Sequence, residues 1–245
     1  MTAAIFGVTS RIGRELALRF AERNIPVWVG ARDLAEAERI AADVRVRTGV
    51  TAIAGTFDAR NADAMPALVE RIERELGPLT NAVLVFGDMG DTAPGEALTA
   101  GDIKRIIEVN YLGAAALAEA LAQSMATRKR GTVAALGSVA GDRGRQSNYA
   151  YGSAKGALAL FMQGLRNRYF AQGVHVLTVK LGFIDTRMTW GMKTKIPVGT
   201  PEDASRAIVE AMDRKKDEIY WPPFWRGIMG IIKAIPEVGF KRLSL

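Results

Sequence analysis

The chain has 245 residues, 49% of them hydrophobic and 24% charged, which fits one sizeable globular domain. It has no cysteine and a single histidine, His175, which excludes disulfides, thiolate chemistry, a histidine-cluster metal site and any catalytic triad that needs a second histidine. The net charge of +7 would suit nucleic acid, an anionic membrane or a phosphorylated ligand, but no basic run interleaved with aromatics occurs in the body of the chain, so we expect no nucleic-acid partner.

The sequence shows no targeting or membrane-spanning segment. The N-terminus enters a predicted strand at once, without the charged and apolar regions of a secretory signal, and no apolar run reaches the roughly 20 residues of a membrane span. We therefore expect a cytoplasmic protein without a metal site, in which His175 has a structural or solvated role.

The first strand, turn and helix form a candidate nucleotide site. Residues 2–8 predict a buried strand, and 14–21 have helical periodicity. A glycine-bounded turn between them would hold a pyrophosphate on free N–H groups at the positive end of the helix. Arg11 replaces the usual middle glycine, so a plain strand-to-helix turn is the alternative. The candidate cofactor residues are Gly7, Thr9, Ser10, Arg11, Ile12 and Gly13.

The end of the second predicted strand, 26–30, bears on cofactor choice. An acidic residue there would bind the adenosine ribose, whereas an arginine would suit a 2′-phosphate. Ala31 stands at the acidic position and Arg32 follows. We predict that NADP(H) is preferred over NAD(H), with Arg32 and Arg11 near the phosphate. The alternatives are that Asp33 binds the ribose of NADH, or that Arg32 simply faces solvent.

Alternation of helices and strands continues, with helices at 34–48 and 61–76 and strands at 50–57 and 81–86. Asp58 and Ala59 follow the third strand, where the carboxylate would accept from the adenine amino group or cap the next helix. Gly87 follows the fourth strand and is a further cofactor candidate. The repeated βαβ order predicts an α/β fold of Rossmann type, a doubly wound parallel sheet of about seven strands in three layers.

A polar residue interrupts the next helical pattern. The amphipathic helix 102–109 runs through Asn110 into an apolar helix that ends near Met125. Asparagine is unfavourable in a helix interior. It marks either a kink at which its amide does polar work, or a loop or buried structural asparagine.

Two hydroxyl groups and an ammonium follow. Ser138 comes after the strand 131–136 and would lie at the ligand-binding edge of a parallel sheet. The predicted helix 148–172 carries Tyr151 and Lys155, four residues apart and therefore on one face. A nearby cation favours phenolate and lowers the phenol pKa toward the range useful for proton transfer. An ordinary surface pair is the alternative.

The last strands bring further cofactor candidates. After the strand 174–181, Gly182 would let the backbone pass close to a nicotinamide, and Thr186 would bond its carboxamide or a phosphate, with Ile184 between them. Residues 188–198 predict either a lid over the substrate, with Trp190 as a contact, or an ordinary surface loop. A helix capped by Thr200 runs to about residue 215, and a seventh strand covers 218–221.

Together these residues resemble the short-chain dehydrogenase/reductase family over about residues 3–222, most specifically in Asn110, Ser138, Tyr151 and Lys155. The resemblance implies an NAD(P)-dependent oxidoreductase that is usually a dimer or tetramer. It implies that Tyr151 protonates the carbonyl oxygen, Ser138 holds that oxygen, and Lys155 lowers the tyrosine pKa and binds the nicotinamide ribose. Asn110 would position a water that links Lys155 to solvent.

The sequence departs from the family pattern at three places. Leu84-Val85-Phe86-Gly87 stands where the family has Asn-Asn-Ala-Gly, Leu181-Gly182 stands where it has Pro-Gly, and Arg11 replaces a glycine. These departures affect the expected cofactor geometry and preference more than the chemistry.

A narrower resemblance is to the actinobacterial decaprenylphosphoryl-2-keto-ribose reductases. It is carried by the segments 7–13, 85–87, 110–111, 143–145, 221–236 and 240–243. Those enzymes reduce a keto-pentose carried on a polyprenyl phosphate. The resemblance therefore implies a keto-sugar reductase in cell wall biosynthesis, acting on a lipid-linked substrate.

The C-terminal tail, residues 223–245, differs from the catalytic domain, 1–222. Its predicted helix is apolar nearly all round, and basic residues are interspersed or follow: Arg226, Lys233, Lys241 and Arg242. Such a helix suits a membrane interface or a lipid-tail channel. The alternative is burial against the domain or a partner subunit. We expect residues 224–245 to bind either a polyprenyl chain or the membrane surface, at its inner face. Deletion of these residues should then abolish co-sedimentation with liposomes and leave the fold intact.

The sequence thus predicts a carbonyl reductase or alcohol dehydrogenase acting on a keto-sugar on a polyprenyl phosphate. A soluble ketone or alcohol is the alternative substrate. A non-catalytic dinucleotide sensor or scaffold is the alternative of another class, although such a module would need no Tyr151 and Lys155 pair.

Overall fold

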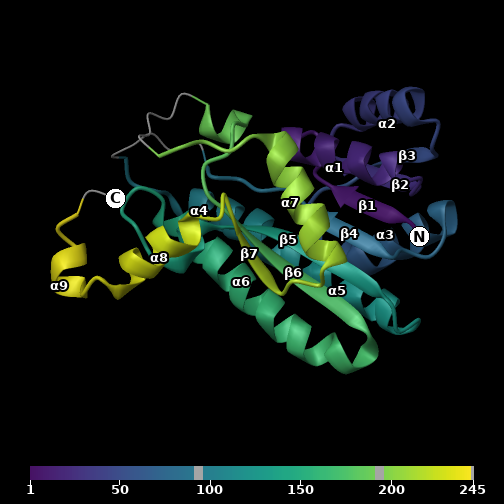
Figure 1. The fold of residues 1–245 in the computed structure, drawn as a ribbon. Coiled ribbons are helices and arrows are strands. Elements are labelled where there is room, and N and C mark those ends of the chain that lie inside the picture. Colours follow the sequence, from purple (N-terminus) through teal and green to yellow (C-terminus); the bar gives the residue numbers. More distant parts are fainter. Residues whose placement is uncertain (91–95, 191–195, 244–245) are drawn as a thin grey trace.

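The computed structural model describes residues 1–90, 96–190 and 196–243. Within these residues, seven strands form one parallel sheet in the order β3-β2-β1-β4-β5-β6-β7 (Figure 1). The predicted doubly wound sheet is confirmed. The strands are β1 (Ala3–Phe6), β2 (Val27–Ala31), β3 (Ala52–Thr56), β4 (Asn81–Leu84), β5 (Gly131–Ser138), β6 (Val174–Leu181) and β7 (Glu218–Trp221).

Helices cover both faces of the sheet and make the three predicted layers (Figure 1). One core lies between the sheet and α1, α2 and α7, and the other between the sheet and α3, α5 and α6. Both faces of the strands are therefore buried, which explains their short apolar runs. The helices are α1 (Arg11–Glu22), α2 (Leu34–Thr48), α3 (Met65–Leu76), α4 (Ala100–Ile107), α5 (Gly113–Ala126), α6 (Tyr149–Tyr169), α7 (Pro201–Asp213), α8 (Trp225–Ala234) and α9 (Glu237–Phe240).

The ends of three elements differ from the sequence prediction for local reasons. Helix α1 begins at Arg11 rather than residue 14, because the Ser10 hydroxyl accepts from the Gly13 amide and caps it. The pattern over 61–76 splits into a 3₁₀ turn and α3, which has a proline in its first turn. Strand β5 extends to Ser138 because β6 pairs with it along its whole length.

The long helical pattern around Asn110 is irregular, as its sequence indicated. Helix α4 passes through a π-helical turn, Glu108–Leu112, into α5. A side chain at Gly113 would place its Cβ 1.8 Å from the Ala59 carbonyl oxygen. The glycine therefore lets the start of α5 lie directly on the loop after β3, which fixes the height of Asn110 against the sheet.

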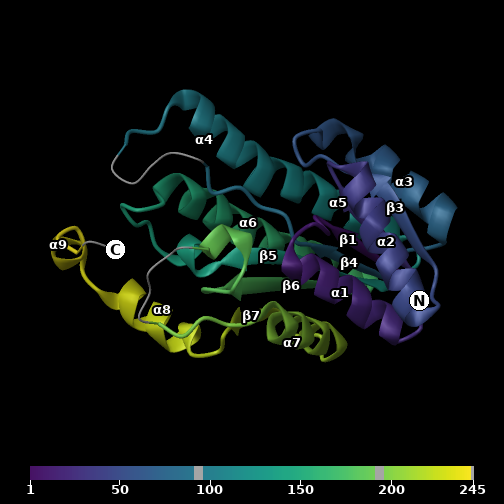
Figure 2. The same ribbon diagram turned by 90° about the horizontal axis from the view of Figure 1, so that it is seen from above.

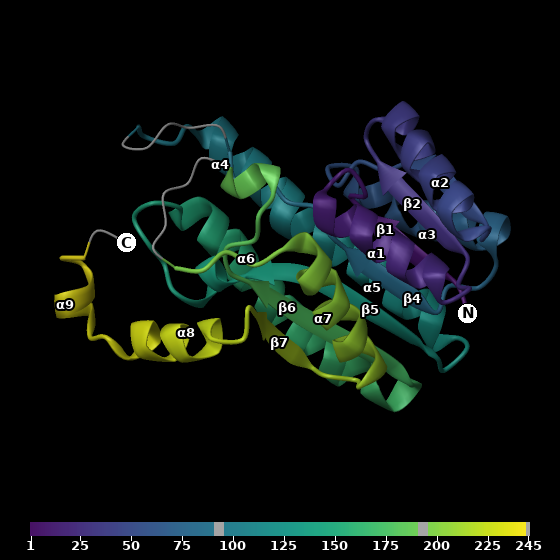
Figure 3. The ribbon, with the colours of Figure 1, turned by 45° about the horizontal axis from the view of Figure 1, so that its top comes forward.

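The C-terminal helices lie beyond β7, at the end of the molecule away from the N-terminus in both views (Figures 2 and 3). Trp225 and Met229 of α8 are buried against Val139 and Tyr220. The tail therefore shares a small core with the domain. Deleting 224–245 would uncover that core, so we predict that the deletion also lowers stability.

Candidate active site

The carboxyl ends of β1, β4, β5 and β6 form one edge of the sheet, here called the carboxyl edge. The chain runs outward from β1 to β3 and then returns to β4 on the other side, so the switch point lies between β1 and β4. In open parallel sheets, ligands bind outside the carboxyl ends at such a point. Most of the residues predicted from the sequence follow these strand ends.

The turn after β1 is tight and leaves backbone amides free at the start of α1. Gly7 has φ of +91°, and a Cβ on it would lie 2.9 Å from the Phe86 nitrogen. A Cβ on Gly13 would lie 2.8 Å from the Gly7 carbonyl oxygen, so the turn packs tightly under α1. Within the described residues, the amides of Arg11 and Ile12 donate to no acceptor. They are free to bind an anion at the helix N-terminus.

The Arg11 side chain does not point to a free anion site. Its guanidinium bonds to the Asp185 carboxylate at 2.8 Å and lies 3.6 Å from Glu202. These contacts join the start of α1 to the loop after β6. An interaction of Arg11 with a cofactor phosphate would have to replace the bond to Asp185.

The residues after β2 bear on whether Arg32 binds the phosphate of NADP(H) or Asp33 binds the ribose of NAD(H). Asp33 caps α2 by accepting from the Glu36 amide at 3.1 Å. Arg32 is exposed and makes no hydrogen bond or ion pair within the described residues, and its charge helps to lower the pKa of Asp58. The cationic side chain is therefore available to a ligand, while the carboxylate already has a structural role.

The Asp58 carboxylate accepts hydrogen bonds from Arg60 rather than from the start of a helix. The Arg60 side chain lies 2.9 Å from its carboxylate and the Arg60 amide donates to it at 3.0 Å. The hydrogen bond with the Arg60 side chain keeps the pKa of Asp58 below its usual value. The cap position of the following turn is Asn61, so the capping interpretation of Asp58 is wrong.

Tyr151 and Ser138 lie close together. Tyr151 is 8% exposed. Burial raises the pKa of Tyr151 to about 12, and the nearby Ser138 hydroxyl opposes this rise. The lowering of the phenol pKa by Lys155 that the sequence predicted is therefore not found.

The position of Lys155 explains why the pKa of Tyr151 is not lowered. Its ammonium donates to the Leu136 carbonyl oxygen at 2.9 Å and lies 5.8 Å from the centre of the Tyr151 ring. The residue is 3% exposed, and burial lowers the pKa of Lys155 to about 8. Loss of hydration is thus the main influence on the pKa of both groups, and it favours the neutral form of each.

Asn110 lies beside Lys155 and is fully buried. Its amide donates to the Asp88 and Ile106 carbonyl oxygens, and its oxygen accepts from the Asp88 amide at 3.1 Å. A Cβ on Gly87 would lie 3.0 Å from the Asn110 oxygen and 3.5 Å from the Lys155 nitrogen. These three residues therefore converge. Both amide hydrogens of Asn110 are used, so a water could bond to this side chain only by donating to the second lone pair of its oxygen.

Three glycines that the sequence analysis did not single out bring Ser138 to Tyr151. A Cβ on Gly152 would lie 2.8 Å from the Ala140 carbonyl oxygen. A Cβ on Gly156 would lie 2.8 Å from the Gly141 carbonyl oxygen, and one on Gly141 would lie 2.6 Å from the Gly156 nitrogen. The loop after β5 therefore rests on the backbone of α6. The position of two glycines directly after Tyr151 and Lys155 was the available signal.

A buried ionic cluster anchors the far side of the same loop. The Asp142 carboxylate lies 2.8 Å from the Lys180 ammonium and accepts from the Tyr220 hydroxyl at 2.7 Å. Lys180 also lies 3.0 Å from Glu218. Burial acts to lower the pKa of Lys180, but the bonds to Asp142 and Glu218 outweigh it and raise the pKa. The cluster joins the loop to β6 and β7.

The loop after β6 meets the C-terminal tail. A Cβ on Gly182 would lie 1.9 Å from the Trp225 indole nitrogen, so this glycine makes room for tryptophan, whatever it does for a nicotinamide. Ile184 is buried, and Thr186 starts the 3₁₀ turn that holds Thr189. Trp190 is 87% exposed. Much of the predicted lid, 191–195, lies outside the described residues.

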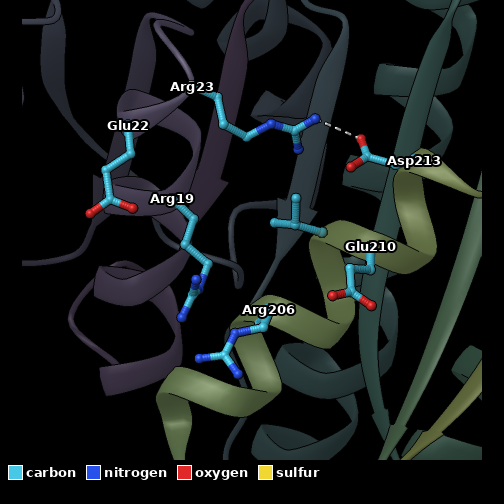
Figure 4. A pocket seen from close by; sticks show the side chains of 7 residues that line it. Arg19, Glu22, Arg23, Arg206, Glu210 and Asp213 are labelled. Carbon is cyan, nitrogen blue, oxygen red and sulfur yellow. Dashed lines mark hydrogen bonds and ion pairs between the residues drawn. The ribbon is translucent and has the colours of Figure 1, made fainter.

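A pocket of about 360 Å³ lies between α1 and α7, away from these residues (Figure 4). Its lining residues mix cations and carboxylates, and an ion pair joins Arg23 to Asp213 at 3.0 Å. The lining comes from the end of α1 that lies away from the carboxyl edge, so we assign it no chemistry. In the described part of the chain, no group of three or more His, Asp or Glu could hold a metal ion.

Known proteins match this chain over most of its length. The model of the family described as short chain dehydrogenase matches residues 1–196. An uncharacterised oxidoreductase of Mycobacterium tuberculosis is 35% identical over 240 residues, covering 98% of this chain and 95% of the relative. One of Myxococcus xanthus is 32% identical over 188 residues, covering 77% and 74%. A short-chain dehydrogenase from Sphingobium yanoikuyae in complex with NADPH has a TM-score of 0.79 and 25% identity, covering 96% of each chain.

A parallel sheet with a nucleotide turn and a Ser138, Tyr151 and Lys155 cluster at its carboxyl edge defines a dinucleotide-dependent oxidoreductase. The chain belongs to the short-chain dehydrogenase family. It is an NAD(P)-dependent oxidoreductase that acts on CH–OH or keto groups. The predicted family, fold and enzyme class are confirmed.

Proposed function

We propose that this oxidoreductase reduces the keto group of a sugar carried on a polyprenyl phosphate, as its narrower resemblance implies. The observation that carries the proposal is the position of α8. Its Trp225 lies against Gly182 at the carboxyl edge, while Ile231 is 70% exposed on the same helix. A helix with one face on the site and another offering apolar surface suits a substrate whose tail is a lipid.

The preferred cofactor in this proposal is NADP(H). The available Arg32 and the occupied Asp33 support it, since a guanidinium binds a 2′-phosphate and a capping carboxylate is already used. The similar Sphingobium yanoikuyae dehydrogenase, whose structure is a complex with NADPH, agrees with this preference. The cofactor would lie on the turn at Gly7 and along Gly87.

The bound nicotinamide would supply a hydride to the carbonyl carbon. In this proposal Ser138 and Tyr151 both bond to the carbonyl oxygen, and Tyr151 gives it a proton. A phenol with a pKa raised to about 12 stays protonated at neutral pH, yet it can protonate an alkoxide, which is a far stronger base. Lys155 would use its remaining N–H groups to bind the nicotinamide ribose, and Asn110 would keep the loop after β4 in position.

The tail would bring the enzyme to the inner face of the membrane as a peripheral protein. Its exposed apolar residues Ile231 and Val238 lie among exposed cations, a combination that favours an anionic lipid surface. In the described part of the chain, no helix is long and apolar enough to cross a membrane.

We further propose a homo-oligomer, a dimer or tetramer, because Leu160 and Phe170 at α6 are 70% and 80% exposed. Size-exclusion chromatography with light scattering tests this. A monomer would reject it.

Steady-state oxidation of NADPH with a polyprenyl-phosphate keto-pentose, compared with simple ketones, tests the function. Turnover of the lipid-linked sugar is expected, and Tyr151→Phe should lower it by about 10²–10⁴-fold. The matched control is Tyr149→Phe, since Tyr149 is 51% exposed in the same helical turn. Turnover of simple ketones alone would reject the lipid-linked sugar and keep the oxidoreductase.

A further inference from the structure

Two arginines, Arg143 and Arg145, lie between Ser138 and Tyr151, and the fold uses only the first. Arg143 donates to the carbonyl oxygens of Ile232, Lys233 and Ile235 at the end of α8. It also pairs with Glu237 and lies 3.9 Å from the centre of the Phe240 ring. Arg143 therefore holds α8 and α9 on the domain.

Arg145 has no such partners. Within the described residues its guanidinium makes no hydrogen bond or ion pair, and its Nε is shielded from solvent without an acceptor. The charge of Asp142 acts on it, but that carboxylate already binds Lys180 and Tyr220. Burial lowers the pKa of Arg145, which agrees with a cation that lacks a bound counter-charge.

A half-buried guanidinium without an acceptor is costly, because it has lost water without gaining a partner. Arginine keeps its charge under such conditions, and its planar donors match the oxygens of a phosphate or carboxylate. A cation without an acceptor in the loop that joins Ser138 to Tyr151 is explained if an anionic ligand completes its bonds.

A second unpaired group lies in the same turn. The Asn148 oxygen is shielded from solvent and accepts no hydrogen bond within the described residues. A Cβ on Gly152 would lie 3.8 Å from it, which places this oxygen at the first turn of α6, next to Tyr151. An unpaired donor and an unpaired acceptor in one turn fit a ligand that carries both an anionic group and hydroxyl groups.

We propose that Arg145 binds the phosphate of the substrate. The assignment rests on the proposed function, which supplies a phosphate close to the reacting sugar. It accounts for two arginines in one loop with different environments, one engaged by the tail and one left for the ligand.

Binding of farnesyl phosphate to the full chain saturated with NADP⁺, measured by calorimetry, tests the assignment. Arg145→Gln should weaken farnesyl phosphate by about tenfold or more and leave farnesol, which has no phosphate, unchanged. Arg145→Lys should recover part of the affinity. The matched control is Arg47→Gln on α2, where the side chain is 54% exposed and far from the carboxyl edge.

Equal binding of farnesyl phosphate by Arg145→Gln and the wild type would overturn the assignment. So would a wild type that does not distinguish farnesyl phosphate from farnesol, or a parallel loss of NADPH affinity in Arg145→Gln, which would place Arg145 in the cofactor site. If Arg145-dependent binding persists while the lipid-linked keto-pentose is not turned over, the proposed sugar fails and the phosphate site stands.

Discussion

At the scale of single residues, burial rather than proximity sets the chemistry of the site. The sequence predicted that Lys155 would lower the pKa of Tyr151. In the structure both side chains are almost fully buried, and Lys155 bonds to a carbonyl oxygen instead. The four-residue spacing placed the two groups on one face correctly, but spacing carries no information on desolvation.

The pKa of Lys155 predicts how stability depends on pH. Its pKa is about 8 in the folded protein, against 10.5 for an ordinary solvated lysine, so between these values the unfolded chain binds more protons. Stability contributed by this group should therefore rise from pH 8 to 10, by about 2–3 kcal/mol. Denaturant unfolding of the wild type and Lys155→Met across this range measures it. Parallel pH curves for the two proteins would contradict the prediction.

Arg32 predicts the cofactor preference. Arg32→Ser should lower kcat/KM with NADPH by about tenfold or more, because a charge-assisted bond to the 2′-phosphate is lost, and should change NADH little. Steady-state rates with both cofactors measure the ratio. Arg39→Ser on α2 serves as a control, since Arg39 is exposed and pairs with Glu36. A wild type that strongly prefers NADH would show the assignment of Arg32 to be wrong.

At the scale of elements, close backbone contacts position the site. Helix α6 and the loop after β5 touch through Gly141, Gly152 and Gly156, and the π-helical turn places Asn110 against the loop after β4. The sequence signalled the irregular helix through a single asparagine. The two glycines directly after Tyr151 and Lys155 were a weaker signal, because helical glycines occur for several reasons and do not show by themselves that they face a loop.

Gly156→Ala tests this contact. Its Cβ would meet the Gly141 carbonyl oxygen at 2.8 Å, so the loop must shift, at a cost of about 1–3 kcal/mol in the free energy of unfolding. The shift should also lower kcat, because Ser138 and Tyr151 separate. Gly164→Ala is the matched control in α6, since its Cβ would meet nothing within 4 Å, and it should stabilise by about 0.5–1 kcal/mol. Equal effects of the two substitutions would refute the contact.

At the scale of the whole molecule, one face of the C-terminal tail packs on the domain and another face exposes apolar side chains to solvent. Trp225 and Met229 are buried, whereas Ile231 and Val238 are 70% and 65% exposed. The two interpretations from the sequence, burial against the domain and contact with lipid, therefore apply to different faces. Point substitutions on the exposed face test the second without disturbing the first.

Ile231→Asp with Val238→Asp should abolish co-sedimentation with vesicles that contain anionic lipid, because apolar area is lost and negative charge is added. Wild-type binding should weaken as salt rises toward about 1 M. Val46→Asp on α2 is the control, since Val46 is 86% exposed and lies outside both the tail and the proposed subunit interface. Unchanged sedimentation of the double variant would remove the membrane from the proposed function.

The sequence by itself determined the parallel sheet, the order of its elements and the residues at the carboxyl edge. Apolar runs of strand length and glycine turns are local signals, and each can be read without knowing its neighbours. Only the tertiary structure decided the raised pKa of Tyr151, the contact of Arg11 with Asp185 and the packing of Trp225 on Gly182. It also decided that the Arg145 guanidinium has no acceptor among the described residues. Each of these depends on which distant residues remove water or supply a partner, and the spacing of residues along a chain does not contain that information.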